Sequence, residues 1–270
     1  MISFSSKNYY NESGTLLLAK GAPITLEMLK KLQQYKEVDL SEVTSDYKLE
    51  KKKYVEQTQR LKERFNVTNE QNFNQVSDIL IKILFESKHK PWWMYINTLS
   101  NYIDWVYTHS IDVAMISLMI ALKLEYPKKS LLELGTGALL HDVGKLLIPK
   151  SILQKTQPLN EVEKMILSQH CELGMDSITG CSLPEASTDI ILQHHERLDG
   201  SGYPNKLKSE HISEYAKIVM IADAFDAITA GRPYKKSKDS ERALSILKNQ
   251  DEKYSKKYLI ILEDILTLNE

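Results

Sequence analysis

The stretch "HHERLDGSGYP", residues 194–204, places two adjacent histidines and a glutamate directly before a segment that must leave a helix. Gly supplies permissive backbone angles and Pro stops a helix, so the second half alone predicts only a turn. The first half holds three side chains that bind metals or protons: His194, His195 and Glu196. Whether this stretch is a simple helix end or part of a metal site depends on where the chain places comparable side chains.

The residues around this stretch carry the apolar spacing of helices. One such pattern is formed by Val76, Ile79, Leu80, Ile83 and Leu84. Similar patterns predict helices at 96–124, 129–145, 160–174, 185–199, 213–230, 239–247 and 255–268, the third of these opened by a capping box of Asn160 and Glu163. The sequence shows no alternating strand pattern after residue 45. We therefore expect a mainly all-α fold, with a helical catalytic domain over 75–270.

The first 45 residues differ from the rest. They predict a short strand at 15–18, a Gly-Ala-Pro turn, a helix at 25–35 and another short strand, which together form a small α/β module. This module has no recognisable catalytic group and is a candidate regulatory unit. Residues 46–74 are charged and helix-prone, so we expect them to form a solvated helical linker.

Composition excludes several classes of function. The 270 residues are 42% hydrophobic and 26% charged, with a formal net charge of −1, so a long nucleic acid is not an expected partner. Two cysteines make no disulfide framework, which fits a reducing compartment. The longest apolar run, 113–122, is too short to span a bilayer, and the first residues lack the apolar core of a signal peptide. We expect a cytoplasmic protein without a membrane span.

Five of the seven histidines lie in predicted helices beside acids or beside one another. His141 and Asp142 adjoin at the end of an apolar helix, and imidazole with carboxylate is a ligand pair suited to zinc, iron or manganese. The carboxylate of Asp142 could bridge two ions. Lys145 follows three residues later, where a continued helix would put it on the same face, and its charge could neutralise a phosphate.

Other candidate ligands are spread along the chain. They are His109 in "YTHSIDVA", His170 in "LSQHCELG", and Asp223 and Asp226 in "IADAFDAITAGRPYKK". Any one of them, taken singly, is more often a hydrogen-bonded or surface residue than a ligand. The set is harder to dismiss, because helices that carry this many polar groups need an internal polar cluster to bury them.

Three motifs, in this order along the chain, carry a resemblance to a known family. "HDVGK" at 141–145, "HHERLDGSGYP" at 194–204 and "IADAFDAITAGRPYKK" at 221–236 resemble the HD-GYP family of bacterial phosphodiesterases, a group of HD metal-dependent phosphohydrolases. The resemblance covers about 75–250. It implies an HD-type helical bundle whose metal centre hydrolyses cyclic di-GMP to pGpG and GMP, with a bridging hydroxide as nucleophile.

The resemblance also implies the ligands. One metal would be held by His109, His141, Asp142 and Asp223. A second would share Asp142 and be held by His170, His194 and His195. Members with three metals have an additional Glu one helical turn before the first histidine, where this chain has Trp105, so a third ion is not expected. Two divalent ions are therefore expected, iron first and manganese as the alternative.

The remaining roles follow from the same motifs. Asp142 and Lys145 would be catalytic, with Lys145 holding a phosphate oxygen, and Arg232 and Lys235 would contact the ligand. Tyr203 would face either the nucleotide or a protein partner. Supporting residues would be Glu196, Asp199 and Asp226, of which Asp226 would orient a histidine. The leaving oxygen would be protonated by water or by Asp199.

Two alternatives remain open at this point. The chain could be a weakly active sensor or adaptor that binds a cyclic dinucleotide or protein partners through the Gly-Tyr-Pro loop and the N-terminal module. It could also cleave another cyclic dinucleotide, such as cyclic GMP-AMP. Adaptors often lose metal ligands, whereas this chain has every ligand of a two-metal site, which favours the enzyme.

Overall fold

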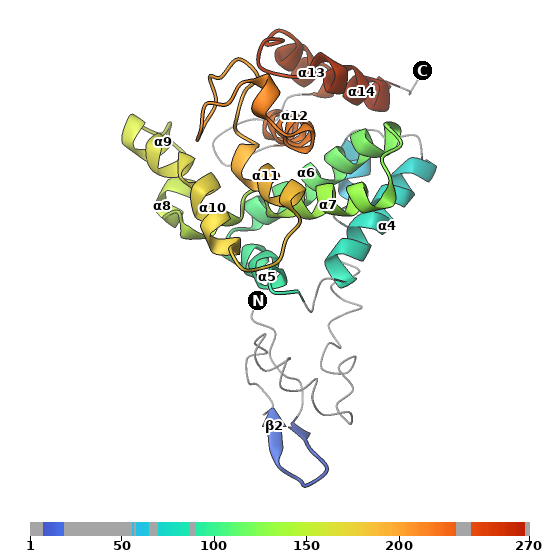
Figure 1. Ribbon diagram of the computed structural model, residues 1–270, viewed down its shortest axis with the longest axis vertical. Helices are drawn as coiled ribbons and strands as arrows, with labels where there is room; N and C mark the ends of the chain where they lie inside the picture. Colours follow the sequence, from blue (N-terminus) through green and yellow to red (C-terminus); the bar gives the residue numbers. More distant parts are fainter. Residues whose placement is uncertain are drawn as a thin grey trace.

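The computed structural model describes residues 8–18, 56, 58–64, 70–86, 90–230 and 239–267, and the described part is mainly helical (Figure 1). Near the N-terminus, β1 (Tyr9–Tyr10) pairs antiparallel with β2 (Leu16–Leu18), which confirms the strand expected at 15–18. The helix expected at 25–35 and the strand after it lie outside the described residues. The boundaries proposed for the module and the linker therefore stay predictions.

The first half of the helical domain is built around one buried helix. Four helices make up this half: α4 (Glu70–Glu86), α5 (Trp93–Tyr102), α6 (Asp104–Lys123) and α7 (Lys128–Leu140). Helix α6 packs against the other three and against α12 (Glu214–Thr229). By length and composition α6 could cross a membrane, but 83% of its most apolar window is buried inside the protein. The apolar run at 113–122 is thus part of a core helix, as expected.

The second half adds shorter elements that pack on α6 and α7. They are η1 (Val143–Leu147), α8 (Lys150–Leu153), α9 (Glu161–Ser168), α10 (His170–Ile178), α11 (Glu185–Gln193), η2 (Ser209–His211), α13 (Ser240–Lys248) and α14 (Lys256–Thr267). Helix α11 packs on α7, and α10 packs on the 3₁₀ segment η1. Figure 1 shows α11 beside α7 and α10 beside α11, with α12 above them.

Several predicted helices are shorter in the structure. The helix expected at 96–124 breaks at Ile103, whose extended backbone (φ −150°, ψ 117°) separates α5 from α6. The apolar spacing continues across the break because both helices pack on the same core. The helix expected at 160–174 begins with the predicted Asn160–Glu163 capping box but is split at Gln169 into α9 and α10.

Two further corrections place the histidines at helix ends. The helix expected at 129–145 ends at Leu140, and the chain continues through His141 and Asp142 into the 3₁₀ segment η1. The helix expected at 185–199 ends at Gln193, so His194 is its C-cap. A helix end leaves backbone carbonyls without intrahelical partners. The predicted helices were therefore too long at their C-terminal ends, and the position of His141 and His194 at the C-caps supplies carbonyl acceptors for their rings.

Gly144 allows the elements around the histidines to approach closely. A Cβ atom at this position would lie 1.9 Å from the carbonyl oxygen of His170 and 2.6 Å from the amide nitrogen of Gly174. Both are backbone atoms of α10, so no side-chain movement could relieve the overlap. The glycine in "HDVGK" thus lets η1 lie directly on α10 and brings Asp142 beside His170.

Candidate metal centre

Five histidines and two aspartates from separate elements meet inside the bundle. Their donor atoms form two groups, and within each group all donor atoms lie within 4.8 Å of one another. We call them the α10–α11 group, with Asp142, His170, His194 and His195, and the α6–α12 group, with His109, His141 and Asp223. The structure therefore brings together every ligand that the sequence predicted, in the two sets that it predicted.

Asp142 lies between the two groups and turns one oxygen toward each. Its Oδ2 is 3.7 Å from Nε2 of His109 and 3.4 Å from Nε2 of His141. Its Oδ1 is 3.4 Å from Nε2 of His170 and 3.9 Å from Nε2 of His194. This arrangement is the one that a carboxylate needs if it is to bridge two ions.

Hydrogen bonds from Nδ1 fix three of the rings to nearby carbonyl oxygens. Nδ1 of His141 contacts the carbonyl oxygen of Ala138 at 2.7 Å, and Nδ1 of His170 contacts that of Leu167 at 2.7 Å. Nδ1 of His194 lies 3.1 Å from the carbonyl oxygens of both residue 190 and residue 191. A carbonyl oxygen only accepts, so Nδ1 must carry the proton in each ring. A neutral ring then has a free lone pair on Nε2, the atom that faces the cluster.

This tautomer leaves an unfavourable contact that a cation would relieve. Nε2 of His170 and Nε2 of His194 are 3.2 Å apart, so two lone pairs face each other. Within the described part of the chain, Nε2 of His141 and Oδ1 of Asp142 are buried without a hydrogen-bond partner. Buried acceptors that point at one another cost free energy unless something positive lies between them. The donor set therefore fits metal ions.

The charge states of the buried ligands also suit a metal. Burial lowers the pKa of His170 to about 4 and holds the pKa values of His194 and His195 well below their usual range. These rings are neutral at pH 7, as ligation requires. Burial alone would raise the pKa of Asp142, but its interactions with His141 and with the Lys145 ammonium outweigh burial and hold that pKa well below its usual range. The carboxylate is thus ionised.

Lys145 contacts the bridging carboxylate although the α-helix does not reach it. Its Nζ donates to Oδ2 of Asp142 across the 3₁₀ segment, where residues three apart lie on one side. The expected helical continuation was wrong, but the expected proximity is present. The Lys145 ammonium also lies 5.7 Å from the ring centroid of Trp105. A cavity of about 330 Å³ opens here, lined by Trp105, Lys145, Leu167 and residues 152–159.

Tyr203 packs against a ligand. Its ring stacks on that of His195, with centroids 4.8 Å apart and an interplanar angle of 28°, and its amide donates to the carbonyl oxygen of His195 at 3.2 Å. The Tyr203–Pro204 peptide bond is cis. The structure thus gives Tyr203 a packing role that the sequence did not predict, and its contact with substrate or a partner stays a prediction.

Two acidic residues before the Gly-Tyr-Pro turn, Glu196 and Asp199, stabilise the conformation of this loop. The buried carboxylate of Glu196 accepts hydrogen bonds from the amides of Asn205 (2.7 Å) and Leu207 (2.9 Å). Asp199 accepts from the amide of Ser201 at 2.9 Å, and this hydrogen bonding lowers its pKa. A lowered pKa makes Asp199 a poor proton donor. Both residues therefore shape the loop rather than orient a ligand.

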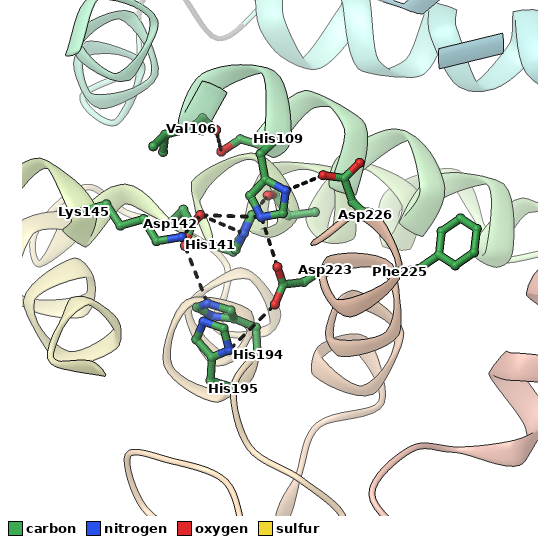
Figure 2. A network of polar contacts seen from close by, with 12 residues as sticks. Val106, His109, His141, Asp142, Lys145, His194, His195, Asp223, Phe225 and Asp226 are labelled. Atoms are coloured by element: carbon green, nitrogen blue, oxygen red, sulfur yellow. Dashed lines mark hydrogen bonds and ion pairs between the residues drawn. The ribbon is translucent and has the colours of Figure 1, made fainter. Parts of the chain in front are cut away.

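Asp226 orients His109, as predicted. Its Oδ2 accepts from Nδ1 of His109 at 2.6 Å, while Nε2 of that ring lies 3.0 Å from Oδ1 of Asp223. Figure 2 shows His109 between the two aspartates, with Asp142, His194 and His195 on the Asp223 side. The predicted ligand contacts Arg232 and Lys235 lie outside the described residues.

Two residues without a predicted role, Arg64 and Asp112, also contact the centre's surroundings. Arg64 contacts both Asp226 and Asp112, and the Asp112 side chain is only 2% exposed. Burial and the charge of Asp226 raise the pKa of Asp112 to about 7, while Arg64 opposes the rise. The available signal was Asp112 itself, because a carboxylate inside an apolar helix needs a cation nearby.

A helical bundle with two adjoining groups of buried histidine and aspartate donors is the architecture of a metal-dependent helical protein. Comparison with known proteins gives the family. A profile described as "HD domain" matches residues 94–257, so the chain belongs to the HD domain family, and the resemblance to its HD-GYP group is confirmed.

Several characterised proteins are similar to this chain over part of its length. The cyclic di-GMP phosphodiesterase PA4108 of Pseudomonas aeruginosa is 37% identical over 142 residues, covering 52% of this chain and 34% of the relative. A cyclic di-GMP phosphodiesterase of Thermotoga maritima is 36% identical over 179 residues, covering 65% and 46%. The 3'3'-cGAMP-specific phosphodiesterase 2 of Vibrio cholerae is 44% identical over 98 residues, covering 36% and 19%. The chain thus spans less than half the length of each of these relatives.

A solved structure shares the fold. The HDG"Y"P protein Bd1817 from Bdellovibrio bacteriovorus aligns with a TM-score of 0.56 at 19% identity, covering 98% of this chain and 94% of its own. At this identity the likeness concerns the fold, and it agrees with the predicted helical bundle with a small N-terminal module.

Proposed function

We propose that this chain is a metal-dependent phosphodiesterase that hydrolyses cyclic di-GMP to pGpG and GMP. The observation that carries the proposal is the position of Asp142, whose two oxygens face two separate groups of buried donors. Two divalent ions held in this way supply an activated water and neutralise the charge that develops on a phosphodiester. The relatives named as cyclic di-GMP phosphodiesterases support this substrate.

The chain's own residues have separable tasks in this reaction. The Asp142 carboxylate faces both donor groups and fixes their positions relative to each other. Its neighbour Lys145 brings a buried ammonium to the same carboxylate, where it would hold a phosphate oxygen of the substrate. Tyr203 covers the outer face of His195 and limits access of water to that ring. Arg232 and Lys235 remain proposed contacts to the ligand.

The donor types also guide the choice of metal. Five imidazoles and two carboxylates suit iron, manganese or zinc, whereas magnesium prefers oxygen ligands. We propose two ions, with iron first and manganese as the alternative. Cys171 is buried next to His170, but its sulfur belongs to neither donor group.

One experiment tests the proposal. Protein prepared anaerobically with iron or with manganese should bind two ions and convert cyclic di-GMP to pGpG and GMP. Asp142→Ala should do neither. Wild type that binds two ions but cleaves no cyclic dinucleotide would indicate the sensor or adaptor instead.

A second substrate is specifically favoured by the comparisons. The Vibrio cholerae relative with 44% identity is named as specific for 3'3'-cGAMP. We therefore propose cyclic GMP-AMP as the alternative substrate. Turnover of equal concentrations of the two dinucleotides in one reaction, resolved by chromatography, decides between them, because the ratio of the initial rates equals the ratio of kcat/KM.

A further inference from the structure

Arg64 joins the segment before the helical domain to the interior of that domain. It lies in the helical stretch 58–64, outside the region that the HD domain profile matches. Its Nη1 donates to Oδ2 of Asp112 on α6 at 3.0 Å, and its Nη2 donates to Oδ1 of Asp226 on α12. These partners are 48 and 162 residues away in the chain. One side chain thus spans two helices that also carry metal ligands.

The two carboxylates are buried deeply enough to need a cation. The side chains of Asp112 and Asp226 are 2% and 0% exposed, whereas that of Arg64 is 23% exposed. Two like charges at this depth repel each other and lack water, so a cation with directed donors stabilises them. A guanidinium provides two parallel N–H directions, one for each carboxylate. Arg60 lies farther off, 3.9 Å from Asp112, with a side chain that is 57% exposed.

The contact continues to the metal ligands through Asp226. Arg64 holds Oδ1 of this carboxylate, and Oδ2 accepts the Nδ1 proton of His109 at 2.6 Å. That hydrogen bond sets both the tautomer and the direction of the ring, whose Nε2 points to Asp223 at 3.0 Å. In Figure 2, Asp226 meets one nitrogen of the His109 ring and Asp223 meets the other. If the Asp226 side chain rotates, the His109 ring loses the hydrogen bond that orients it, and its Nε2 lone pair no longer points into the α6–α12 group.

His109 differs from His141, His170 and His194 in this respect. The rings of His141, His170 and His194 are held by carbonyl oxygens three or four residues earlier in the chain. His109 is held by a side chain from a different helix, and that side chain is held by Arg64. The orientation of this one ligand therefore depends on the segment that precedes the helical domain.

We propose that Arg64 is a positioning residue for the metal centre, and that it couples the segment before the helical domain to the affinity of the α6–α12 group. The proposal rests on the metal site of the proposed function. It assigns the α10–α11 group, in which His170 and His194 are fixed by carbonyl oxygens nearby in the chain, as the half whose affinity does not depend on Arg64. Movement of the 58–64 helix would then change occupancy of one ion and leave the other in place.

The test compares three substitutions in the full chain. Arg64→Gln removes the charge, Arg64→Lys keeps it but cannot donate to both carboxylates in the same geometry, and Arg60→Gln removes a neighbouring exposed charge as a matched control. Metal-free protein is titrated with Mn²⁺, and free and bound ions are followed by electron paramagnetic resonance, which separates a coupled pair from a single ion. Thermal melts of the metal-free proteins check the fold.

For Arg64→Gln we expect one site to weaken by about tenfold or more, the usual effect of losing a partner that orients a ligand. The coupled signal should give way to that of a single ion at limiting Mn²⁺. Arg64→Lys should recover part of the affinity, and Arg60→Gln should match wild type. A cavity of about 760 Å³ borders Arg64, so the shorter side chain leaves no enclosed void.

Other results would overturn the proposal. If Arg64→Gln binds both ions as wild type does, Arg64 does not position the centre, while the proposed function stands. If both sites weaken equally, the coupling to one group is wrong. If Arg64→Gln does not fold, Arg64→Lys takes its place in the test. Wild-type affinity at both metal sites in Arg64→Lys would then contradict the positioning role of Arg64. Wild type that binds ions but cleaves no cyclic dinucleotide contradicts only the proposed function, and wild type that binds no ion contradicts both.

Discussion

The two donor groups of the centre are built in different ways. In the α10–α11 group, His170 and His194 are oriented by carbonyl oxygens at the ends of the helices just before them. In the α6–α12 group, His109 is oriented by Asp226, which in turn contacts Arg64. A carbonyl moves with the chain that carries the ring, whereas a side-chain partner depends on packing between distant segments. Two rings of the first group are thus fixed by local structure, whereas one ring of the second group, that of His109, is fixed by tertiary structure.

Asp142 joins the two groups, so its loss should have the largest effect. Asp142→Ala removes the carboxylate that faces both sets of donors and leaves the Lys145 ammonium without its partner. We expect loss of the paired metal site and a fall in kcat/KM of about a thousandfold, because metal ions contribute several kcal/mol of charge stabilisation. Metal analysis and turnover of cyclic di-GMP measure the two effects.

The isosteric control for that change is Asp142→Asn. It keeps the shape and one carbonyl oxygen, so it should fold like wild type and still fail to hold a pair of ions. If Asp142→Ala cleaves as fast as wild type, the assignment of the bridge is wrong.

Gly144→Ala should break the α10–α11 group by displacing the backbone beneath it. The added Cβ atom would meet the carbonyl oxygen of His170 at 1.9 Å. We expect a loss of about 3 kcal/mol in the free energy of unfolding, the upper end for overpacking, measured by urea denaturation. The control is Gly135→Ala, whose Cβ atom meets only the flexible ends of Ile83 and Leu118, so about 1 kcal/mol is expected. Equal losses in the two variants would contradict the close-approach argument.

Metal removal should destabilise wild type, because the donors would again face one another without a cation. At free metal one hundred times the Kd, each bound ion stabilises the fold by about 2.7 kcal/mol. A chelator should therefore lower Tm by roughly 5–10 °C per ion in a domain of this size. Differential scanning fluorimetry with and without the chelator measures the change.

Substitutions in one donor group at a time test whether the two ions bind separately. His109→Gln and His170→Gln each remove one ligand, from the α6–α12 group and the α10–α11 group respectively. Each should keep about half of the chelator effect if the two groups bind their ions separately. A complete loss in either variant would mean that the pair binds only as a unit.

The same contrast explains what the sequence could predict. Three members of the α10–α11 group, Asp142, His194 and His195, follow from the short motifs "HDVGK" and "HHE", whereas His170 lies in a separate stretch, "LSQHCELG". Helix breaks at Ile103 and Gln169 could not be predicted from apolar spacing, because the helices on both sides bury their faces in one core. Four of the five ligand histidines therefore lie at or just past helix ends, where the sequence placed them inside helices.

For the α6–α12 group, the contacts of Arg64 could not be predicted from the sequence. Its residue type is common in a charged helical stretch, and nothing within that stretch indicates a buried partner. Only Asp112, inside an apolar helix and therefore in need of a cation, hinted at the contact. Which cation meets it depends on the packing of segments far apart in the chain.

The smallest expected effect concerns the cavity beside Lys145, which lies outside both donor groups. Trp105 lines this cavity and its ring faces the Lys145 ammonium, so a base of the dinucleotide could stack there while its phosphate meets the lysine. Trp105→Ala should raise KM for cyclic di-GMP about tenfold, the usual loss for one stacked base, and leave kcat and the metal count unchanged. Met94→Ala, which truncates a side chain that is 47% exposed, is the control. If Trp105→Ala instead lowers the metal count with KM unchanged, the residue supports His109, one helical turn away, and the cavity is no part of the substrate site.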